Sequence, residues 1–457
     1  MEHIMSIANG DGLWADCLLP LKEGTAWRVR EITSNDDWGQ GLQEHELARL
    51  KAQKFCGKTF DFGVLEASQE ILLVVDPDQI RAGWGVLAQK LGPIGLAIDP
   101  QDVGFIQRAV GFCSGVRQFD ETSPYLVADT ELAPEQKVIL QSFLSGIKLI
   151  EAPTSLLGVE GLMCAGRLLG DLHNAIVEII AVDELQDQYP AIHAVGRAAE
   201  EAPRLLHLAW GAKDHPRLCL VGKGVVFDSG GLNLKPGGSM ALMRKDMGGA
   251  AFVLALASAI MARKLPVRLE VYVPAVENAI GPGALRPGDI MATRAGLEVE
   301  IGNTDAEGRL ILADALALAT EQELDLLIDV ATLTGAARVA MGFDLTPYMS
   351  RDTETRNALL QVAEGVNDPL WPLPLWEDYG RKLRTPFADL NNVGDDGAGG
   401  AIIAACFLSC FCGAADDWLH LDLAAWDHGD RPGRRKGGAM AGWFSLLSYL
   451  EERYGAA

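Results

Sequence analysis

The chain reads Leu218-Cys219-Leu220-Val221-Gly222-Lys223-Gly224-Val225-Val226-Phe227-Asp228 at the point that decides its fold. Residues 218–227 are apolar apart from the break around Lys223, which is the pattern of a strand buried in a parallel sheet. A buried lysine is expensive unless its charge is paired. Lys223 can instead lose its proton and donate its nitrogen lone pair to a metal. The alternatives are a salt bridge to Asp228 or a side chain that extends to solvent.

Strands alternate with helices from Ile150 onward. Residues 267–273 alternate apolar and polar side chains as a strand does, and residues 325–331 are a short, mainly apolar run. This order predicts an α/β fold with a mainly parallel sheet and helices on both faces. Ligands of such sheets bind beyond the carboxyl ends of the strands. Lys223 and Asp228 both fall at the end of one predicted strand.

The chain divides into two unequal parts. Residues 1–133 contain predicted strands at 26–32, 71–75 and 94–98 and a helix at 79–91, which indicates a smaller N-terminal α/β domain without a catalytic motif. Residues 134–149 are predicted to form a linking helix, because Pro134 suits a first helical turn. Residues 150–457 form the predicted catalytic domain.

Composition excludes some classes of protein. The chain has 457 residues and a net charge of −23, which argues against a nucleic-acid partner. The start at Met1 lacks the basic and apolar regions of a secretory signal. The longest apolar runs, 249–262 and 401–415, are shorter than the roughly 20 residues that span a bilayer, so we expect buried helices. Eight cysteines without paired zinc spacing fit a reducing cytoplasm, where we expect the protein to act.

A second informative stretch is Asn303-Thr304-Asp305-Ala306-Glu307-Gly308-Arg309-Leu310. In an extended segment, alternate side chains face one way. Asp305, Glu307 and Arg309 would then project together, and two carboxylates this close favour a bound metal ion. The alternative is a helix capping box made by Thr304 and Glu307 before the apolar residues that follow.

Asp246 belongs to a third stretch, Met243-Arg244-Lys245-Asp246-Met247-Gly248-Gly249. It precedes a predicted apolar helix at 250–261, so its alternative role is a helix N-cap. The chain lacks HExxH, GxSxG and Walker A motifs, which argues against the common zinc-protease helix, a serine-hydrolase elbow and a P-loop. The joint occurrence of the three stretches favours a metal site.

In their order and spacing these stretches resemble the leucyl aminopeptidase (cytosol aminopeptidase) family of two-metal exopeptidases. The resemblance covers about the C-terminal two-thirds of the chain. It rests on VGKGVVFDSGG from Val221, the Leu234-Lys235-Pro236 step, MRKDMGGAA from Met243, RPGDI from Arg286, NTDAEGRL from Asn303 and DVATLTGAA from Asp329.

The resemblance implies a role for each matching residue. Asp228 and Glu307 would bridge two divalent metal ions, with Lys223 and Asp246 completing the tighter site and Asp305 the more exchangeable one. Lys235 would polarise the scissile carbonyl, and Arg309 would hold a bicarbonate ion that shuttles protons. Three positions would line an apolar, leucine-preferring substrate pocket: Met243, Thr332 and Gly335.

The implied function is hydrolysis of the N-terminal residue of peptides with a free N-terminus. Oxygen ligands suit magnesium and manganese, and a neutral amine suits zinc, so zinc or manganese is expected, with magnesium and cobalt as further candidates. The family forms hexamers, and we expect a homohexamer without a membrane or nucleic-acid partner. Two alternatives stay open, a two-metal phosphoesterase and a catalytically silent assembly protein. The basic loop 431–436 matches no motif.

Overall fold

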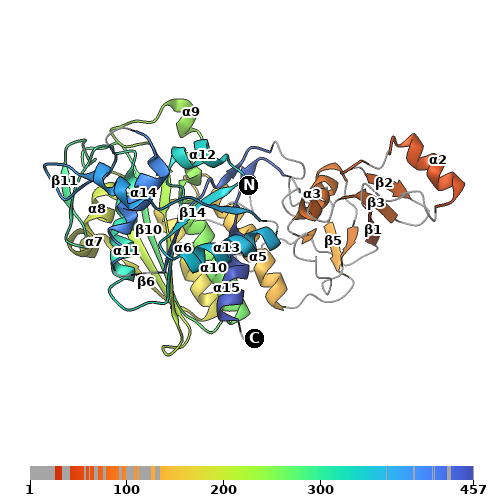
Figure 1. Cartoon of the computed structure of the whole chain (residues 1–457), viewed down its shortest axis with the longest axis horizontal. Helices are drawn as coiled ribbons and strands as arrows, with labels where there is room; N and C mark the ends of the chain where they lie inside the picture. Colours follow the sequence, from red (N-terminus) through yellow and green to blue (C-terminus); the bar gives the residue numbers. More distant parts are fainter. Residues whose placement is uncertain are drawn as a thin grey trace. The chain divides into compact units, whose positions relative to one another are not determined.

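The computed structural model describes residues 134–455, apart from 367, 395–396, 414, 416 and 430–433. Before residue 134 it describes 26–32, 42–55, 58–60, 62–65, 70–75, 79–91, 95–98, 108–109, 111–112 and 125–128. These residues fall into two compact units (Figure 1), a large one from 145–426 with 438–455 and a smaller one from 17–144 with 427–437. The boundaries expected from the sequence, at 134 and 150, stay predictions. Residues 431–433 of the basic loop lie outside the described residues.

The smaller unit contains a sheet with the strand order β2-β3-β1-β4-β5. β1 lies parallel to β3 and β4, β5 lies parallel to β4, and only β2 is antiparallel to its neighbour. The three strands and the helix expected from the sequence are confirmed to within one residue at each end. The elements are β1 (Ala26–Ile32), α2 (Glu44–Ala52), β2 (Phe62–Leu65), β3 (Glu70–Val74), α3 (Ile80–Lys90), β4 (Gly95–Ile98) and β5 (Tyr125–Ala128).

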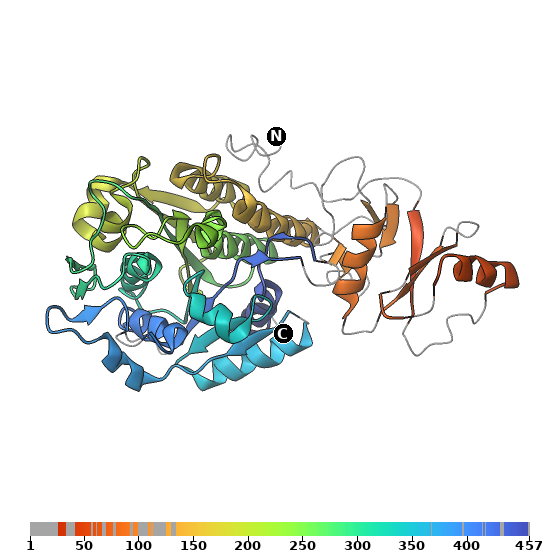
Figure 2. The same cartoon turned by 90° about the horizontal axis from the view of Figure 1, so that it is seen from above.

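The large unit is built on one sheet with the order β15-β14-β17-β13-β8-β10-β7-β6, and β9 also pairs with β10 (Figures 1 and 2). Its centre, from β17 to β10, is parallel, whereas β14, β7 and β6 introduce antiparallel pairs toward the edges. The predicted fold class is thereby confirmed. The strands are β6 (Ile176–Ile180), β7 (Arg204–Trp210), β8 (Arg217–Gly222), β9 (Gly224–Asp228), β10 (Arg268–Asn278), β13 (Leu326–Ala331), β14 (Thr346–Ser350), β15 (Leu370–Pro372) and β17 (Trp418–Asp422).

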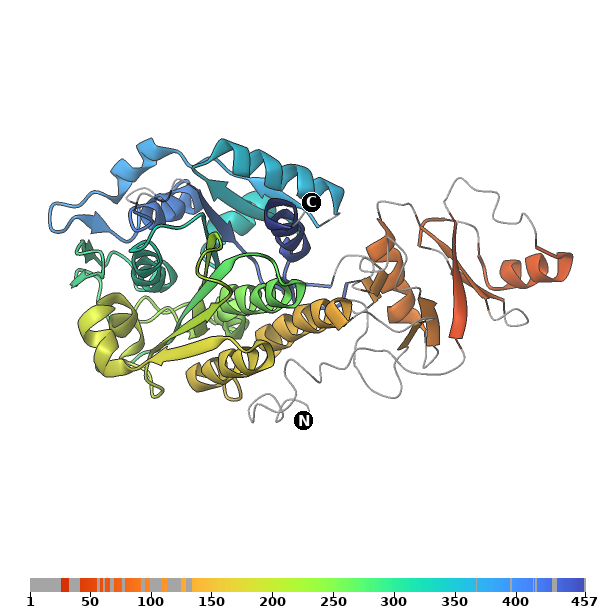
Figure 3. The same ribbon diagram turned by 90° about the horizontal axis from the view of Figure 1, so that it is seen from below.

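Helices cover both faces of this sheet (Figure 3). Cys219 and Val221 of β8 pack in one buried cluster with residues of α8, α11 and α14. Leu218 and Leu220 point to the opposite face, where α10 packs on β8 and on α6 and α15. The helices are α5 (Pro134–Glu151), α6 (Val159–His173), α7 (Val182–Gln188), α8 (Pro190–Gly196), α9 (Gly237–Met240), α10 (Gly248–Arg263), α11 (Glu307–Ala319), α12 (Gly335–Met341), α13 (Thr353–Gly365), α14 (Gly400–Ser409) and α15 (Trp443–Tyr454).

The remaining elements are short. A small sheet pairs β11 (Ile290–Ala292), β12 (Glu298–Glu300) and β16 (Leu390–Asn391). Two 3-10 helices, η2 (Met243–Met247) and η3 (Glu377–Leu383), and two strands of two residues each, β18 (Trp426–Asp427) and β19 (Gly437–Gly438), complete the list.

Two predicted elements differ in length from those observed. The apolar run 401–415 is helical only to Ser409, because apolar composition alone does not mark a helix end. The strand expected at 267–273 continues as β10 to Asn278, since its later residues pair with β7 and β9. This extension carries Asn278 to the edge of the sheet where the functional motifs converge.

The apolar helix α10 is a core element. Among the described residues, Met243–Arg263 is the one helical stretch long and apolar enough to cross a membrane, and 94% of its most apolar window is buried inside the structure. The prediction of a buried helix in this region is confirmed.

Candidate active site

Lys223 occupies the interruption between β8 and β9. Its backbone N–H donates to Val330 O on β13 at 3.0 Å, and its carbonyl accepts from Ala250 N on α10 at 2.9 Å. The neighbouring Gly222 lies against α10, where a Cβ atom would stand 2.8 Å from the Cα atom of Ala250. The lysine is therefore fixed from both sides at the carboxyl end of β8. The single strand expected at 218–227 is wrong, because the chain forms two strands, β8 and β9, separated at Lys223.

The Lys223 side chain is 2% exposed and surrounded by acceptors. Its Nζ atom lies 2.7 Å from Asp246 Oδ2, 3.0 Å from Glu307 Oε1 and 3.0 Å from Thr332 O. Burial alone would lower the pKa of Lys223, but the Asp246 and Glu307 carboxylates outweigh it and raise the pKa. The salt-bridge partners therefore differ from Asp228, the partner considered from the sequence.

Lys235 is the second cation of the site, on the loop that follows β9. Its Nζ atom lies 2.7 Å from Asp228 Oδ2 and 2.5 Å from Asp305 Oδ1. Burial lowers the pKa of Lys235, and the neighbouring Asp228 carboxylate reverses this effect and raises it. The lysine is partly exposed, so its ammonium can reach both the carboxylates and a ligand that enters from solvent.

The carboxylates of Asp228, Asp305 and Glu307 form the acidic centre of the site. One oxygen from each carboxylate lies within 4.8 Å of those of the other two. Burial, and then the Asp228 carboxylate, raise the pKa of Glu307, while burial raises that of Asp305. Like charges this close repel one another unless a cation lies between them. The cluster therefore fits a divalent metal ion.

Asp246 approaches the same cluster from η2. The hydroxyl of Thr332 lies 2.8 Å from Asp246 Oδ1 and 2.9 Å from its backbone carbonyl. Asp246 Oδ2 and Asp305 Oδ1 are buried oxygens that lie near lysine nitrogens yet accept no hydrogen bond of good geometry. Such oxygens are suited to coordinate a cation. The donor set of four carboxylates and one amine therefore fits a pair of divalent ions.

Two sequence interpretations of these motifs are wrong. The segment from Asp305 to Arg309 is not extended, because α11 begins at Glu307. Thr304 does not cap α11, since its hydroxyl donates to Gly230 O at 2.7 Å and accepts from Asn233 N at 2.8 Å. The turn before α11 brings Asp305 and Glu307 together, whereas a strand was expected to do so.

Asp246 also does not cap α10. The residue in the N-cap position is Met247, and no side-chain cap hydrogen bond is present there. The Asp246 carboxylate turns toward Lys223 and Thr332 instead. The capping alternative is therefore wrong, because the 3-10 turn η2 precedes the helix.

Arg309 lies in the first turns of α11. Its guanidinium donates to Asn392 O at 2.6 Å, and its Nε atom is buried without a hydrogen-bond partner. Burial lowers the pKa of Arg309 to about 10. A cation with an unused donor is a suitable contact for a small anion.

The three predicted pocket residues occupy different environments. Met243 is half-buried on η2, and Gly335 is exposed at the start of α12, with nothing within 4 Å of a Cβ atom built there. Thr332 is 2% exposed, and its hydroxyl faces Asp246. The pocket assignment stays a prediction for all three residues.

Sequence reasoning missed two buried asparagines. The Oδ1 atom of Asn392 accepts from Gly302 N at 2.8 Å and from Asn303 N at 3.1 Å, and its Nδ2 donates to Asn303 O at 2.8 Å. Asn278 contacts the carboxylates themselves. Asn392 carries no sequence signal, whereas Asn278 could have been found as a polar residue that ends a buried strand.

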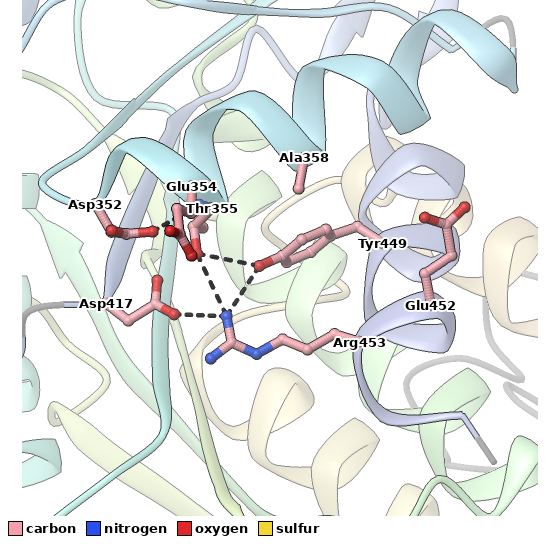
Figure 4. A pocket seen from close by; sticks show the side chains of 8 residues that line it. All are labelled: Asp352, Glu354, Thr355, Ala358, Asp417, Tyr449, Glu452 and Arg453. Atoms are coloured by element: carbon pink, nitrogen blue, oxygen red, sulfur yellow. Dashed lines mark hydrogen bonds and ion pairs between the residues drawn. The ribbon is translucent and has the colours of Figure 1, made fainter. Parts of the chain in front are cut away.

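A separate polar cavity of about 620 Å³ lies between α13 and α15 (Figure 4). Arg453 donates there to Asp417, Thr355 and Tyr449. Asp417 directly precedes β17, so this cavity opens at the amino end of the parallel strands, opposite the acidic cluster. Its one lining cation, Arg453, forms an ion pair with Asp417.

Comparison with known proteins identifies the family. Residues 148–446 match the model of the cytosol aminopeptidase family, catalytic domain. The chain belongs to this family. It is 34% identical to a probable cytosol aminopeptidase from Corynebacterium glutamicum, over 83% of this chain and 81% of that protein. A second relative, from Dechloromonas aromatica, is 41% identical over 71% of this chain and 66% of its own length, so just under two thirds of it is matched.

Solved structures agree with this assignment. A cytosol aminopeptidase from Coxiella burnetii superposes with a TM-score of 0.88 at 36% identity, covering 96% of this chain and all of that one. The bottromycin maturation enzyme BotP in complex with Mn has a TM-score of 0.81 at 27% identity, with 96% and 100% covered. The family expected from the sequence motifs is therefore confirmed.

Proposed function

We propose that this protein is a metal-dependent aminopeptidase that releases the N-terminal residue from peptides. The observation that carries the proposal is the acidic centre of Asp228, Asp305 and Glu307, in which one oxygen from each residue lies within 4.8 Å of the other two. Lys223 and Asp246 border it at the ends of adjacent elements. Family membership and the manganese complex of a structural neighbour support this interpretation.

The ligands divide between two proposed metal positions. Asp228 and Glu307 would contribute to both, Lys223 and Asp246 to the tighter one, and Asp305 to the exchangeable one. Two divalent ions, zinc or manganese with magnesium or cobalt as further candidates, would supply an activated water and polarise the peptide carbonyl.

Lys235 and Arg309 would act on the substrate. The Lys235 ammonium would donate a hydrogen bond to the carbonyl oxygen as negative charge develops on it. The unused Nε donor of Arg309 supports a bound bicarbonate, which could accept and return protons. A free substrate amine would be drawn to the carboxylate cluster, which would restrict cleavage to the N-terminal residue.

Met243, Thr332 and Gly335 would form the pocket for the first side chain. The open space above Gly335 supports this role, and the apolar side chain of Met243 favours leucine or a similar residue. We further propose a cytoplasmic homohexamer with residues 150–457 as catalytic domain, joined through a helix at 134–149 to a domain at 1–133. The hexamer rests on the family resemblance, whereas the location rests on the cysteine usage and the domain bounds on the order of predicted elements.

The test is an assay of the intact protein with leucine p-nitroanilide and with p-nitrophenyl phosphate. Chelator should abolish leucine release, and added manganese or zinc should restore it. Phosphate release in place of leucine release would favour a phosphoesterase, and inactivity of the metal-loaded protein toward both would favour an assembly role. An N-acetylated peptide cleaved as fast as its free-amine parent would refute the exopeptidase proposal.

A further inference from the structure

Asn278 ends β10 with its side-chain amide between two proposed ligands. Its Nδ2 atom lies 2.8 Å from Asp228 Oδ1, 3.0 Å from Thr304 O and 3.4 Å from Glu307 Oε2. The residue is 5% exposed. An amide nitrogen carries two hydrogens. Asn278 can therefore bind Asp228 and the Thr304 carbonyl well, with Glu307 as a longer contact.

The contact with Asp228 selects one of its oxygens. Asp228 Oδ1 accepts from Asn278 Nδ2 and from Gly230 N, each at 2.8 Å. A carboxylate oxygen has about two lone-pair sites, so these two donors occupy Oδ1. Oδ2 is left to face Lys235 and the acidic centre. The donors thus decide which oxygen is offered to a cation.

A strand irregularity brings Asn278 opposite Asp228. In the parallel pairing of β9 with β10, Val276 pairs with Val225, but Glu277 pairs with Phe227 and Asn278 with Asp228. Val226 has no partner in this register, and if it paired with Glu277 in a regular register, Asn278 would stand opposite Phe227. Bulges of this kind re-aim side chains next to active sites. The amide therefore meets the carboxylate because of this local feature of β9.

An amide suits this place for an electrostatic reason. It donates hydrogen bonds without carrying charge, so it orients two carboxylates and leaves their negative charge available to a metal. A lysine here would neutralise that charge, and a carboxylate would add repulsion. Partners that hydrogen-bond to metal ligands fix their orientation and commonly contribute about 10–100-fold to metal affinity or activity.

We propose that Asn278 is a positioning residue, which holds Asp228 with Oδ2 toward the metals and steadies Glu307 beside it. This inference rests on the proposed function. It adds a role for a residue outside the ligand and substrate-pocket sets.

The test compares Asn278→Leu, similar in size but without a donor, with Asn391→Leu. Asn391 Nδ2 donates to the Glu300 carboxylate at 3.1 Å, so this control removes a similar bond outside the acidic centre. Each protein would be titrated with Mn²⁺ against a chelator, loaded with Co²⁺ for its visible spectrum, and melted without metal. Asn278→Leu should bind Mn²⁺ about 10–100-fold more weakly and shift the Co²⁺ bands. Asn391→Leu should change only the melting temperature.

The outcomes separate the two proposals. If the unsubstituted protein binds Mn²⁺ and releases leucine while Asn278→Leu matches its affinity and spectrum, the positioning role alone is overturned. If the unsubstituted protein does neither, both proposals are overturned. If Asn278→Leu does not fold, Asn278→Ala is measured in the same way, because it removes the donor and leaves a cavity instead of adding methyl groups.

Discussion

Gly308 lies in the second position of α11, directly against the side chain of Lys223. A glycine-to-alanine change inside a helix usually stabilises it by about 1 kcal/mol. Here the new Cβ atom would stand 2.6 Å from Lys223 Cε, 2.7 Å from its Nζ and 2.8 Å from its Cδ. Ordinary contact begins at 3.4 Å, so the lysine would have to retreat by about 0.8 Å. It is buried and fixed by Asp246 and Glu307.

We therefore expect Gly308→Ala to destabilise the protein by about 1–3 kcal/mol, the usual effect of overpacking a tight core. A displacement of about 1 Å near reacting groups can reduce activity about 10²-fold. Urea unfolding, metal counting and leucine p-nitroanilide hydrolysis would measure the three effects. Gly365→Ala is the control, because Gly365 ends α13 with nothing within 4 Å of its Cβ position. If Gly308→Ala kept native stability, both metals and native turnover, the packing argument would be wrong.

Three further predictions concern the site and the sheet beneath it. Lys223→Arg should lose the tight metal, because arginine offers no free lone pair. Lys235→Arg should keep both metals and lose turnover, and Lys235→Ala should lower kcat about 10²–10³-fold. Metal counting with kinetics checks all three variants, and two metals in Lys223→Arg would exclude Lys223 as a ligand. Asp305→Ala should lose only the exchangeable metal and Asp246→Ala the tight one, so two full equivalents in both variants would contradict the ligand assignment. Burial and Arg309 lower the pKa of His420, but the Asp329 carboxylate at 2.6 Å, helped by Asp422, outweighs them and raises the pKa above 6.5. The His420–Asp329 pair therefore stabilises the fold fully below pH 6.5, and less as pH rises through the raised pKa. His420→Gln should accordingly lose more free energy of unfolding at about pH 6 than at about pH 9. An equal loss at both values would show that His420 does not titrate with folding.

Much of the fold could be predicted because its signals are local. Mainly apolar runs mark β8 and β13, and the alternation of strands with helices implies the parallel sheet. Lys223 and Asp228 were placed at a strand end because that rule needs only the order of elements along the chain. The ends of elements were predicted less well, as α14 and β10 illustrate. A strand ends where its pairing with neighbouring strands ends, and apolar composition alone does not mark the end of a helix.

The sequence by itself determined the family, the α/β class and the group of charged residues at the site. These depend on short motifs, whose residues are neighbours in the chain. Only the tertiary structure decided which charges meet: Lys223 with Asp246 and Glu307, Lys235 with Asp228 and Asp305. It also brought Asn278 to Asp228 through one extra residue in β9. Hydrogen bonds and ion pairs act over a few ångströms, and the distances between segments far apart in sequence are set by sheet register and helix packing, which no single motif encodes.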